Sequence, residues 1–126
     1  MSTPIVEVMT EIPHTVGSQV SPDKAREMME LNACHHLPVL EGGKLIGIIS
    51  DHDLQNNNSG AEKVKDLMTD DPVTVDPKKD VFQVAMMMHE KKIGSVIVAA
   101  TPYSPWGIFT STDAVAFLAK KDTTLT

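Results

Sequence analysis

The chain has 126 residues, of which 41% are hydrophobic and 22% are charged, close to the composition of an average soluble globular domain. Seventeen acidic against eleven basic residues give a formal net charge of -6, and no cluster of lysine and arginine exceeds a pair. This balance argues against binding to the phosphate backbone of nucleic acids. The N-terminus lacks the pattern of a secretory signal, and no apolar run approaches the roughly 20 residues that cross a bilayer.

The first predicted elements are a helix and two strands. Ser21 is a natural N-cap, Pro22 follows at the first helical position, and apolar residues at helical spacing continue to about Ala33. Residues 37–40 and 45–50 are rich in β-branched side chains, and a Gly-Gly pair lies in the turn between them. This segment therefore predicts a β-hairpin.

A polar stretch follows in the middle of the chain. Residues 55–60 are rich in asparagine and poor in apolar side chains, which is typical of a linker. Short helices are expected on either side, one beginning at Asp51 or Asp53 and another over residues 61–68.

The second half repeats the same order of elements. Asp80 is placed to cap a helix whose apolar positions include Val81, Val84, Ala85 and Met88. Strands are then predicted over residues 95–100 and 106–110. The connection between them contains two prolines and is bulkier than its Gly-Gly counterpart.

An internal repeat accounts for this order. Residues 8–16 align with residues 67–75, so that Met9 matches Met68 at a shift of 59, and residues 47–53 match residues 107–113 at a shift of 60. A unit of roughly 60 residues buries little surface alone. We therefore expect the two halves to pack on each other about a pseudo-twofold axis.

The paired pattern resembles a known family. Met-Thr-x-x-Pro-x-Thr-Val, an amphipathic helix, Leu-Pro-Val and Gly-Ile-Ile-Ser-x-x-Asp follow one another as in the tandem cystathionine-β-synthase (CBS) domain pair, or Bateman module. The resemblance runs from about Ile5 to Leu118. It implies an α/β (α+β) fold of two βαββα-type repeats packed about a pseudo-twofold axis. The repeats are expected over residues 1–57 and 58–121, with a frayed tail over 122–126 and no further domain.

The resemblance also implies a role. Such modules bind an adenosine-containing ligand, namely AMP, ADP, ATP or S-adenosylmethionine, in the clefts between the repeats, and they signal its presence to an effector protein. Their usual assembly is a homodimer. We therefore expect a cytoplasmic, non-catalytic regulatory module with no catalytic cofactor, no metal, no nucleic-acid partner and no membrane insertion. The lone Cys34 fits a reducing compartment.

The Gly-Ile-Ile-Ser/Thr-x-x-Asp element has a chemical logic of its own. Ser50 or Thr110 ends a strand, and Asp53 or Asp113 follows three residues later in a helical first turn. Backbone N–H groups and the hydroxyl there suit phosphate oxygens, and an ionised carboxylate suits the hydroxyls of a ribose. The same pattern is also a variant of the helix capping box, which needs no ligand.

The resemblance makes the two clefts unequal. Residues just before Leu-Pro-Val reach phosphates held by the other repeat, so His35 and His36 are expected in the cleft around Asp113. A nearby phosphate would raise the histidine pKa. We therefore expect the affinity of this cleft for a nucleotide to fall as the pH rises from about 6 to 8. The expected ligand-binding residues of this favoured cleft are Thr69, Val73, Ser95, Ile108, Thr110, Asp113, His35 and His36. Those of the second cleft are Thr10, His14, Ile48, Ser50 and Asp53.

Two alternatives stay open. In the first, the chain is a ligand-free CBS dimer that acts as a protein-protein interaction module. This is favoured by the lack of a proline in the second Leu-Pro-Val element and by Arg26, the only arginine, lying on a helix. In the second, the chain is an enzyme in which Cys34 acts as a nucleophile beside a histidine. This is disfavoured because the sequence does not place a nucleophile, a base and an orienting group together in one cleft. Cys34 aligns with Ile93, so we expect it to be a small, buried apolar side chain of the core.

Overall fold

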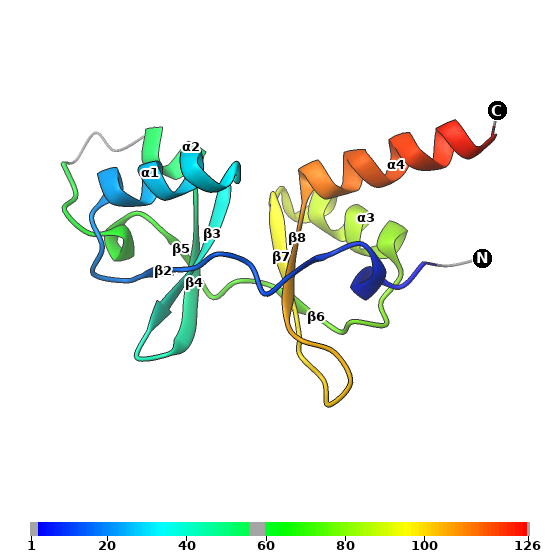
Figure 1. Cartoon of the computed structure of the whole chain (residues 1–126), viewed down its shortest axis with the longest axis horizontal. Coiled ribbons are helices and arrows are strands. Elements are labelled where there is room, and N and C mark those ends of the chain that lie inside the picture. Colours follow the sequence, from blue (N-terminus) through cyan, green and yellow to red (C-terminus); the bar gives the residue numbers. More distant parts are fainter. Residues whose placement is uncertain (1–2, 56–59, 126) are drawn as a thin grey trace. The chain divides into compact units, whose positions relative to one another are not determined.

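The computed structural model describes residues 3–55 and 60–125. The chain divides into two compact units, unit 1 with residues Met1–Ile12 and Val73–Thr126, and unit 2 with residues 13–72. In the described residues, each unit combines helices with a four-stranded sheet of mixed direction (Figure 1). The predicted α+β class is confirmed.

Unit 2 is built on a sheet with the strand order β2-β3-β4-β5, in which β2 runs parallel to β3 and the other pairs are antiparallel. Its first helix begins where the sequence predicts, because Ser21 Oγ accepts a hydrogen bond from Lys24 N at 3.2 Å. The helix ends at a left-handed Ala33. The elements are β2 (Val16–Gly17), α1 (Pro22–Asn32), β3 (His36–Glu41), β4 (Lys44–Ser50), α2 (Asp51–Gln55), η2 (Val64–Asp66) and β5 (Thr69–Asp70).

The β3–β4 hairpin turns through two glycines in the left-handed region, Gly42 at φ 59° and Gly43 at φ 80°. Such angles belong to the two-residue turns that match the twist of a hairpin. The apolar face of this sheet packs against α1 and α2. The buried core of unit 2 consists of Val16, Ala25, Met29, Leu37, Val39, Ile49, Leu54 and Val64.

Unit 1 repeats the plan with the strand order β1-β8-β7-β6. Asp80 caps its first long helix, accepting hydrogen bonds from Phe82 N and Gln83 N, and it also accepts one from Thr3 N at 3.1 Å. The elements are η1 (Ile5–Glu7), β1 (Thr10–Glu11), β6 (Thr74–Val75), α3 (Val81–Lys91), β7 (Ser95–Val98), β8 (Gly107–Thr110) and α4 (Ser111–Leu125).

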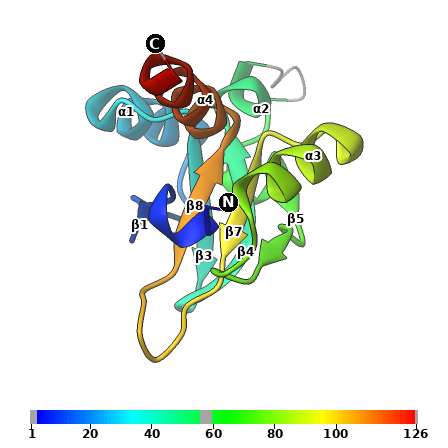
Figure 2. The ribbon, with the colours of Figure 1, turned by 90° about the vertical axis from the view of Figure 1, so that its right-hand side faces the viewer.

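Figure 2 shows α3 and α4 in unit 1, and it shows the β7–β8 connection projecting away from both helices. The core of this unit lies between the sheet, the helices and η1. It consists of Ile5, Met9, Val75, Val81, Val84, Met88, Val96, Val98 and Phe109.

The second hairpin is shorter than predicted. The sequence predicts strands over residues 95–100 and 106–110, whereas β7 ends at Val98 and β8 begins at Gly107. Thr101 and Ser104 close a turn between them, with Thr101 N donating to Ser104 O at 2.9 Å. The prolines on either side of Tyr103 and Ser104 cannot donate backbone hydrogen bonds to a ladder, so the strand pairing stops early.

One further prediction differs from the structure, and two are not tested by it. The helix expected over residues 61–68 is a single 3-10 turn, Val64–Asp66. The tail expected to fray over residues 122–126 overlaps the end of α4, which extends to Leu125, and its fraying stays a prediction. The predicted linker over residues 55–60 lies mostly outside the described residues, which omit 56–59.

The strands at the Met-Thr segments join each sheet to the other half of the sequence. β1 pairs with β8, with Thr10 opposite Ile108, and β5 pairs with β4, with Thr69 opposite Ile48. The pairing is close enough to require glycine on the inner strand. A Cβ at Gly107 would lie 2.5 Å from Met9 Sδ and 2.6 Å from Thr10 O.

Candidate functional site

The junction between β8 and α4 holds a hydroxyl and a carboxylate in mutual contact. Asp113 Oδ2 accepts hydrogen bonds from Thr110 N at 2.9 Å and from Thr110 Oγ1 at 3.1 Å. In return, Asp113 N donates to Thr110 Oγ1 at 3.3 Å. The two residues are half-buried and form a reciprocal capping box at the start of α4.

The junction between β4 and α2 has the same arrangement. Ser50 N donates to Asp53 Oδ2 at 2.9 Å, and Asp53 N donates to Ser50 Oγ at 3.1 Å. The capping interpretation of the Ser/Thr-x-x-Asp pattern is therefore confirmed at both junctions. Within the described residues, no hydrogen bond uses the second carboxylate oxygen, Oδ1, of Asp53 or Asp113. Each junction thus keeps an acceptor that a ligand hydroxyl can reach without breaking the cap.

The strand pairing attaches each Met-Thr segment to the hairpin of the other repeat, so that Thr10 lies beside Ile108 in unit 1 and Thr69 beside Ile48 in unit 2. Both clefts are expected between the repeats, so the assignment of Thr10 to the Asp53 cleft and of Thr69 to the Asp113 cleft stays a prediction. Unit 1 therefore holds Thr10, Val73, Ser95, Ile108, Thr110 and Asp113, and unit 2 holds His14, His35, His36, Ile48, Ser50, Asp53 and Thr69.

The next strand adds one polar residue to each group. Across the β7–β8 ladder Ser95 stands opposite Thr110, and across the β3–β4 ladder His36 stands opposite Ser50. The corresponding position is thus a hydroxyl in unit 1 and an imidazole in unit 2. Whether His36 also faces Asp113 stays a prediction.

His35 has a partner that the sequence did not indicate. Its Nδ1 lies 2.9 Å from Asp51 Oδ2, and both side chains are partly exposed. The backbone brings them together, because Asp51 N donates a hydrogen bond to His35 O at 3.0 Å. Asp51 is the first residue of α2, and His35 directly precedes β3. A separation of 16 residues carries no periodic signal, so only the paired strands reveal this contact. His14, the remaining candidate histidine of unit 2, is exposed.

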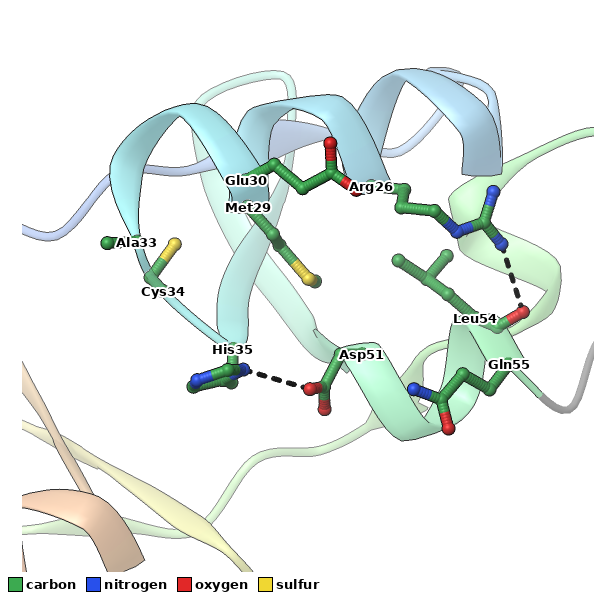
Figure 3. A pocket seen from close by; sticks show the side chains of 9 residues that line it. All are labelled: Arg26, Met29, Glu30, Ala33, Cys34, His35, Asp51, Leu54 and Gln55. Carbon is green, nitrogen blue, oxygen red and sulfur yellow. Dashed lines mark hydrogen bonds and ion pairs between the residues drawn. The ribbon is translucent and has the colours of Figure 1, made fainter.

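A pocket of about 450 Å³ lies between α1 and α2 in unit 2 (Figure 3). Its floor contains Met29 and Leu54, which are 4% and 2% exposed. Arg26 spans one side, with Nη2 donating to Leu54 O at 3.3 Å and Nη1 bonded to Asp23 at 2.8 Å. The lining residues are Arg26, Met29, Glu30, Ala33, Cys34, His35, Asp51, Leu54 and Gln55.

Unit 1 has a pocket of equal volume at the matching place between α3 and α4. Its lining residues are Ala85, Met88, His89, Lys92, Ile93, Ser111 and Ala114. In the repeat alignment the lining residues of the two pockets occupy equivalent positions. Lys92 of unit 1 aligns with Ala33 of unit 2, and Ser111 aligns with Asp51. The unit 2 pocket has carboxylates where the unit 1 pocket has none.

Cys34 is half-buried at the edge of the unit 2 core rather than fully buried. Burial raises the pKa of its thiol above the ordinary value, and a hydrogen bond with the His36 backbone opposes this only in part. A raised pKa reduces the thiolate population that nucleophilic catalysis requires. The described residues contain no group of three or more His, Cys, Asp or Glu that could hold a metal ion.

None of the helices in the described part of the chain has the length and apolarity that a bilayer crossing requires.

Comparison with known proteins identifies the sequence pattern. The family model described as CBS domain matches residues 5–58 and 64–120. A CBS domain-containing protein of Dictyostelium discoideum is 27% identical, with 95% of this chain and 94% of that protein covered. Inosine-5'-monophosphate dehydrogenase of Korarchaeum cryptofilum is 33% identical over 79% of this chain. The matched region makes up only 21% of that enzyme's length.

A solved structure shares the fold over nearly the whole chain. The CBS domain pair of protein MJ0100, in complex with 5'-methylthioadenosine and S-adenosyl-L-methionine, matches with a TM-score of 0.86 and 26% identity. The match covers 96% of this chain and 99% of that one.

Proposed function

Because this chain belongs to the CBS domain family, we propose that it is a non-catalytic regulatory module that binds an adenosine-containing ligand and signals its presence to a partner protein. The family and the similarity to the MJ0100 domain pair, which binds two adenosine derivatives, support this proposal. A ligand can transmit a signal only by binding one conformation of the module better than another. The partner would read that shift in population.

The observation that carries the proposal is the duplicated capping box. Each unit presents a hydroxyl, a helix N-terminus and a carboxylate with an available oxygen at one strand-to-helix junction. In our proposal, Asp113 Oδ1 accepts hydrogen bonds from the ribose hydroxyls, and the Thr110 hydroxyl turns its single proton from Asp113 Oδ2 to a phosphate oxygen, while the two backbone hydrogen bonds of the cap remain. We propose that Thr10 joins this group as well, because β1 holds it beside Ile108 on β8.

The second junction is proposed to act in the same way, with Asp53 for ribose, Ser50 for phosphate and Thr69 beside them. AMP, ADP and ATP offer a phosphate to the hydroxyl and the backbone N–H groups, whereas S-adenosylmethionine has a sulfonium-linked methionine in place of the phosphate. His35 and His36 are proposed to favour phosphate-bearing ligands in the other cleft, around Asp113. That role predicts that the affinity for AMP falls as the pH rises from about 6 to 8.

Calorimetric titration of AMP, ADP, ATP and S-adenosylmethionine tests the proposal. Asp113→Asn keeps an oxygen for the cap and removes the charge that a ribose would use, so we expect affinity to fall about tenfold or more. Glu90→Gln, on the exposed side of α3, is the matched control because it removes one negative charge from the same unit. No heat from any of the four ligands at millimolar concentration would refute the proposal, as would equal losses in both variants.

A second candidate function is partner binding through the helices of unit 1. Met86 on α3 and Val115 on α4 are 63% and 66% exposed, and Phe82 and Leu118 are also exposed. The matching positions in unit 2 are charged or polar, as with Glu27 for Met86. Exposed apolar side chains gathered on one pair of helices are typical of an interaction surface.

We propose that a second copy of the chain covers this surface in a homodimer. Sedimentation equilibrium tests it, with Met86→Lys expected to shift the protein from dimer to monomer and Glu27→Lys as the control at the matching position of unit 2. A wild-type monomer at all concentrations would refute the homodimer.

A further inference from the structure

The pocket between α1 and α2 combines an apolar floor with charged groups on its rim. Met29 and Leu54 are almost fully buried side chains that close its base, and Glu30 and Asp51 lie on opposite sides of it (Figure 3). A volume of about 450 Å³ is within the range of small-molecule sites. The pocket is separate from the Ser50 and Asp53 capping box, neither residue of which lines it.

The charges of the pocket favour a positive ligand. Arg26 also lines the pocket, but its positive charge is paired with Asp23, to which Nη1 donates at 2.8 Å, and Nη2 donates to the carbonyl of Leu54. The carboxylate of Glu30 has no hydrogen-bond or ion-pair partner among the described residues. Asp51 is bonded to His35 through Oδ2 only.

We propose that this pocket binds an aliphatic diamine or a longer polyamine. One ammonium group would bind Glu30 on α1 and the other would bind the Oδ1 atom of Asp51 on α2, because these two carboxylates line the pocket from opposite sides and only Oδ2 of Asp51 is used by His35 (Figure 3). The methylene chain between them would lie over Met29 and Leu54, which removes apolar surface from water. Each half of the ligand thus has a chemically matched counterpart.

The second repeat provides an internal control. The pocket between α3 and α4 has the same volume and the same kind of floor, with Met88 in place of Met29. Lys92 and His89 line it, and none of its lining residues is a carboxylate. A diamine should therefore bind in unit 2 and not in unit 1. This inference goes beyond the adenosine site and does not depend on it.

The test is a titration of the full chain with 1,5-diaminopentane, followed by the backbone amide signals in NMR spectra at constant ionic strength. We expect saturable shifts at α1 and α2 and none at α3 and α4. Butylamine, with one ammonium group, should bind several-fold more weakly. Glu30→Gln and Asp51→Asn should each weaken diamine binding about threefold, the size of a partly exposed ion pair.

The control variant is Glu27→Gln, which lies on α1 outside the pocket and pairs with Lys24. Its diamine affinity should equal that of the wild type. Equal weakening in Glu27→Gln and Glu30→Gln would overturn the inference, because it would show only diffuse attraction to an acidic protein. Shifts of equal size in α3 and α4, or no saturable shift at all, would also overturn it.

Discussion

Substitution of Gly107 by alanine should destabilise unit 1, because the neighbouring strand β1 approaches this position of β8 closely. The added Cβ would lie 2.5 Å from Met9 Sδ and 2.6 Å from Thr10 O. The methionine sulfur belongs to a flexible side chain and can move, but the carbonyl belongs to the backbone of β1. Relief of that contact therefore requires β1 to shift away from β8, and with it Thr10 of the candidate site.

The magnitude follows from two opposing effects. An extra methyl group in a well-packed position costs about 1–3 kcal/mol. Replacement of glycine by alanine also lowers the conformational entropy of the unfolded chain, which stabilises the folded state by about 0.4–1 kcal/mol. The net loss in the free energy of unfolding should be about 1–2 kcal/mol. At an m-value of about 2 kcal/mol/M, the urea midpoint should fall by about 0.5–1 M.

Urea unfolding followed by circular dichroism measures this shift. Gly17→Ala is the matched control, since a Cβ at Gly17 meets only Val20 Cγ2 at an ordinary 3.6 Å. The control should leave the midpoint unchanged or raise it slightly. A Gly107→Ala midpoint equal to that of Gly17→Ala would refute this reasoning.

Three further predictions concern caps and charges. Asp80→Ala removes the acceptor for the first turn of α3 and for Thr3 N, so thermal unfolding should show a loss of about 1–2 kcal/mol, and Asp80→Asn should lose less. Lys92 has a left-handed φ of 56° at the end of α3, so Lys92→Gly should stabilise the chain by up to about 1 kcal/mol, and a loss would contradict the strain argument. Hydrogen bonds from Lys65 and Ser18 lower the pKa of Glu41. The stability from this group is therefore present above the ordinary glutamate pKa and lost as pH falls through the lowered value. A Lys65→Met variant should raise the Glu41 pKa in an NMR titration, and an unchanged value would count against the interaction.

Local features of the fold were predictable because they depend on short stretches of sequence. Ser21 and Asp80 cap α1 and α3 as their side chains and positions predict. The glycine pair after Glu41 forms the expected tight turn between β3 and β4. Each of these depends on residues within about four positions of one another, where side-chain chemistry and backbone preference act directly.

The partners of the Met-Thr segments were not predictable in the same way. A repeat shows that Thr10 and Thr69 are equivalent, but it does not show which hairpin each one joins. That choice depends on long-range strand pairing, which places Thr10 beside Ile108. The contact between His35 and Asp51 was missed for the same reason.

The central claim is that the capping boxes also bind an adenosine ligand, and NMR titration with AMP tests it most directly. Backbone amide signals of Thr110 and Asp113, and of Ser50 and Asp53, should shift in a saturable way while α4 keeps its helical signals. Such a result would show that ligand and cap share the same residues. Unchanged amide signals at both junctions with millimolar AMP, ADP, ATP and S-adenosylmethionine would contradict the account.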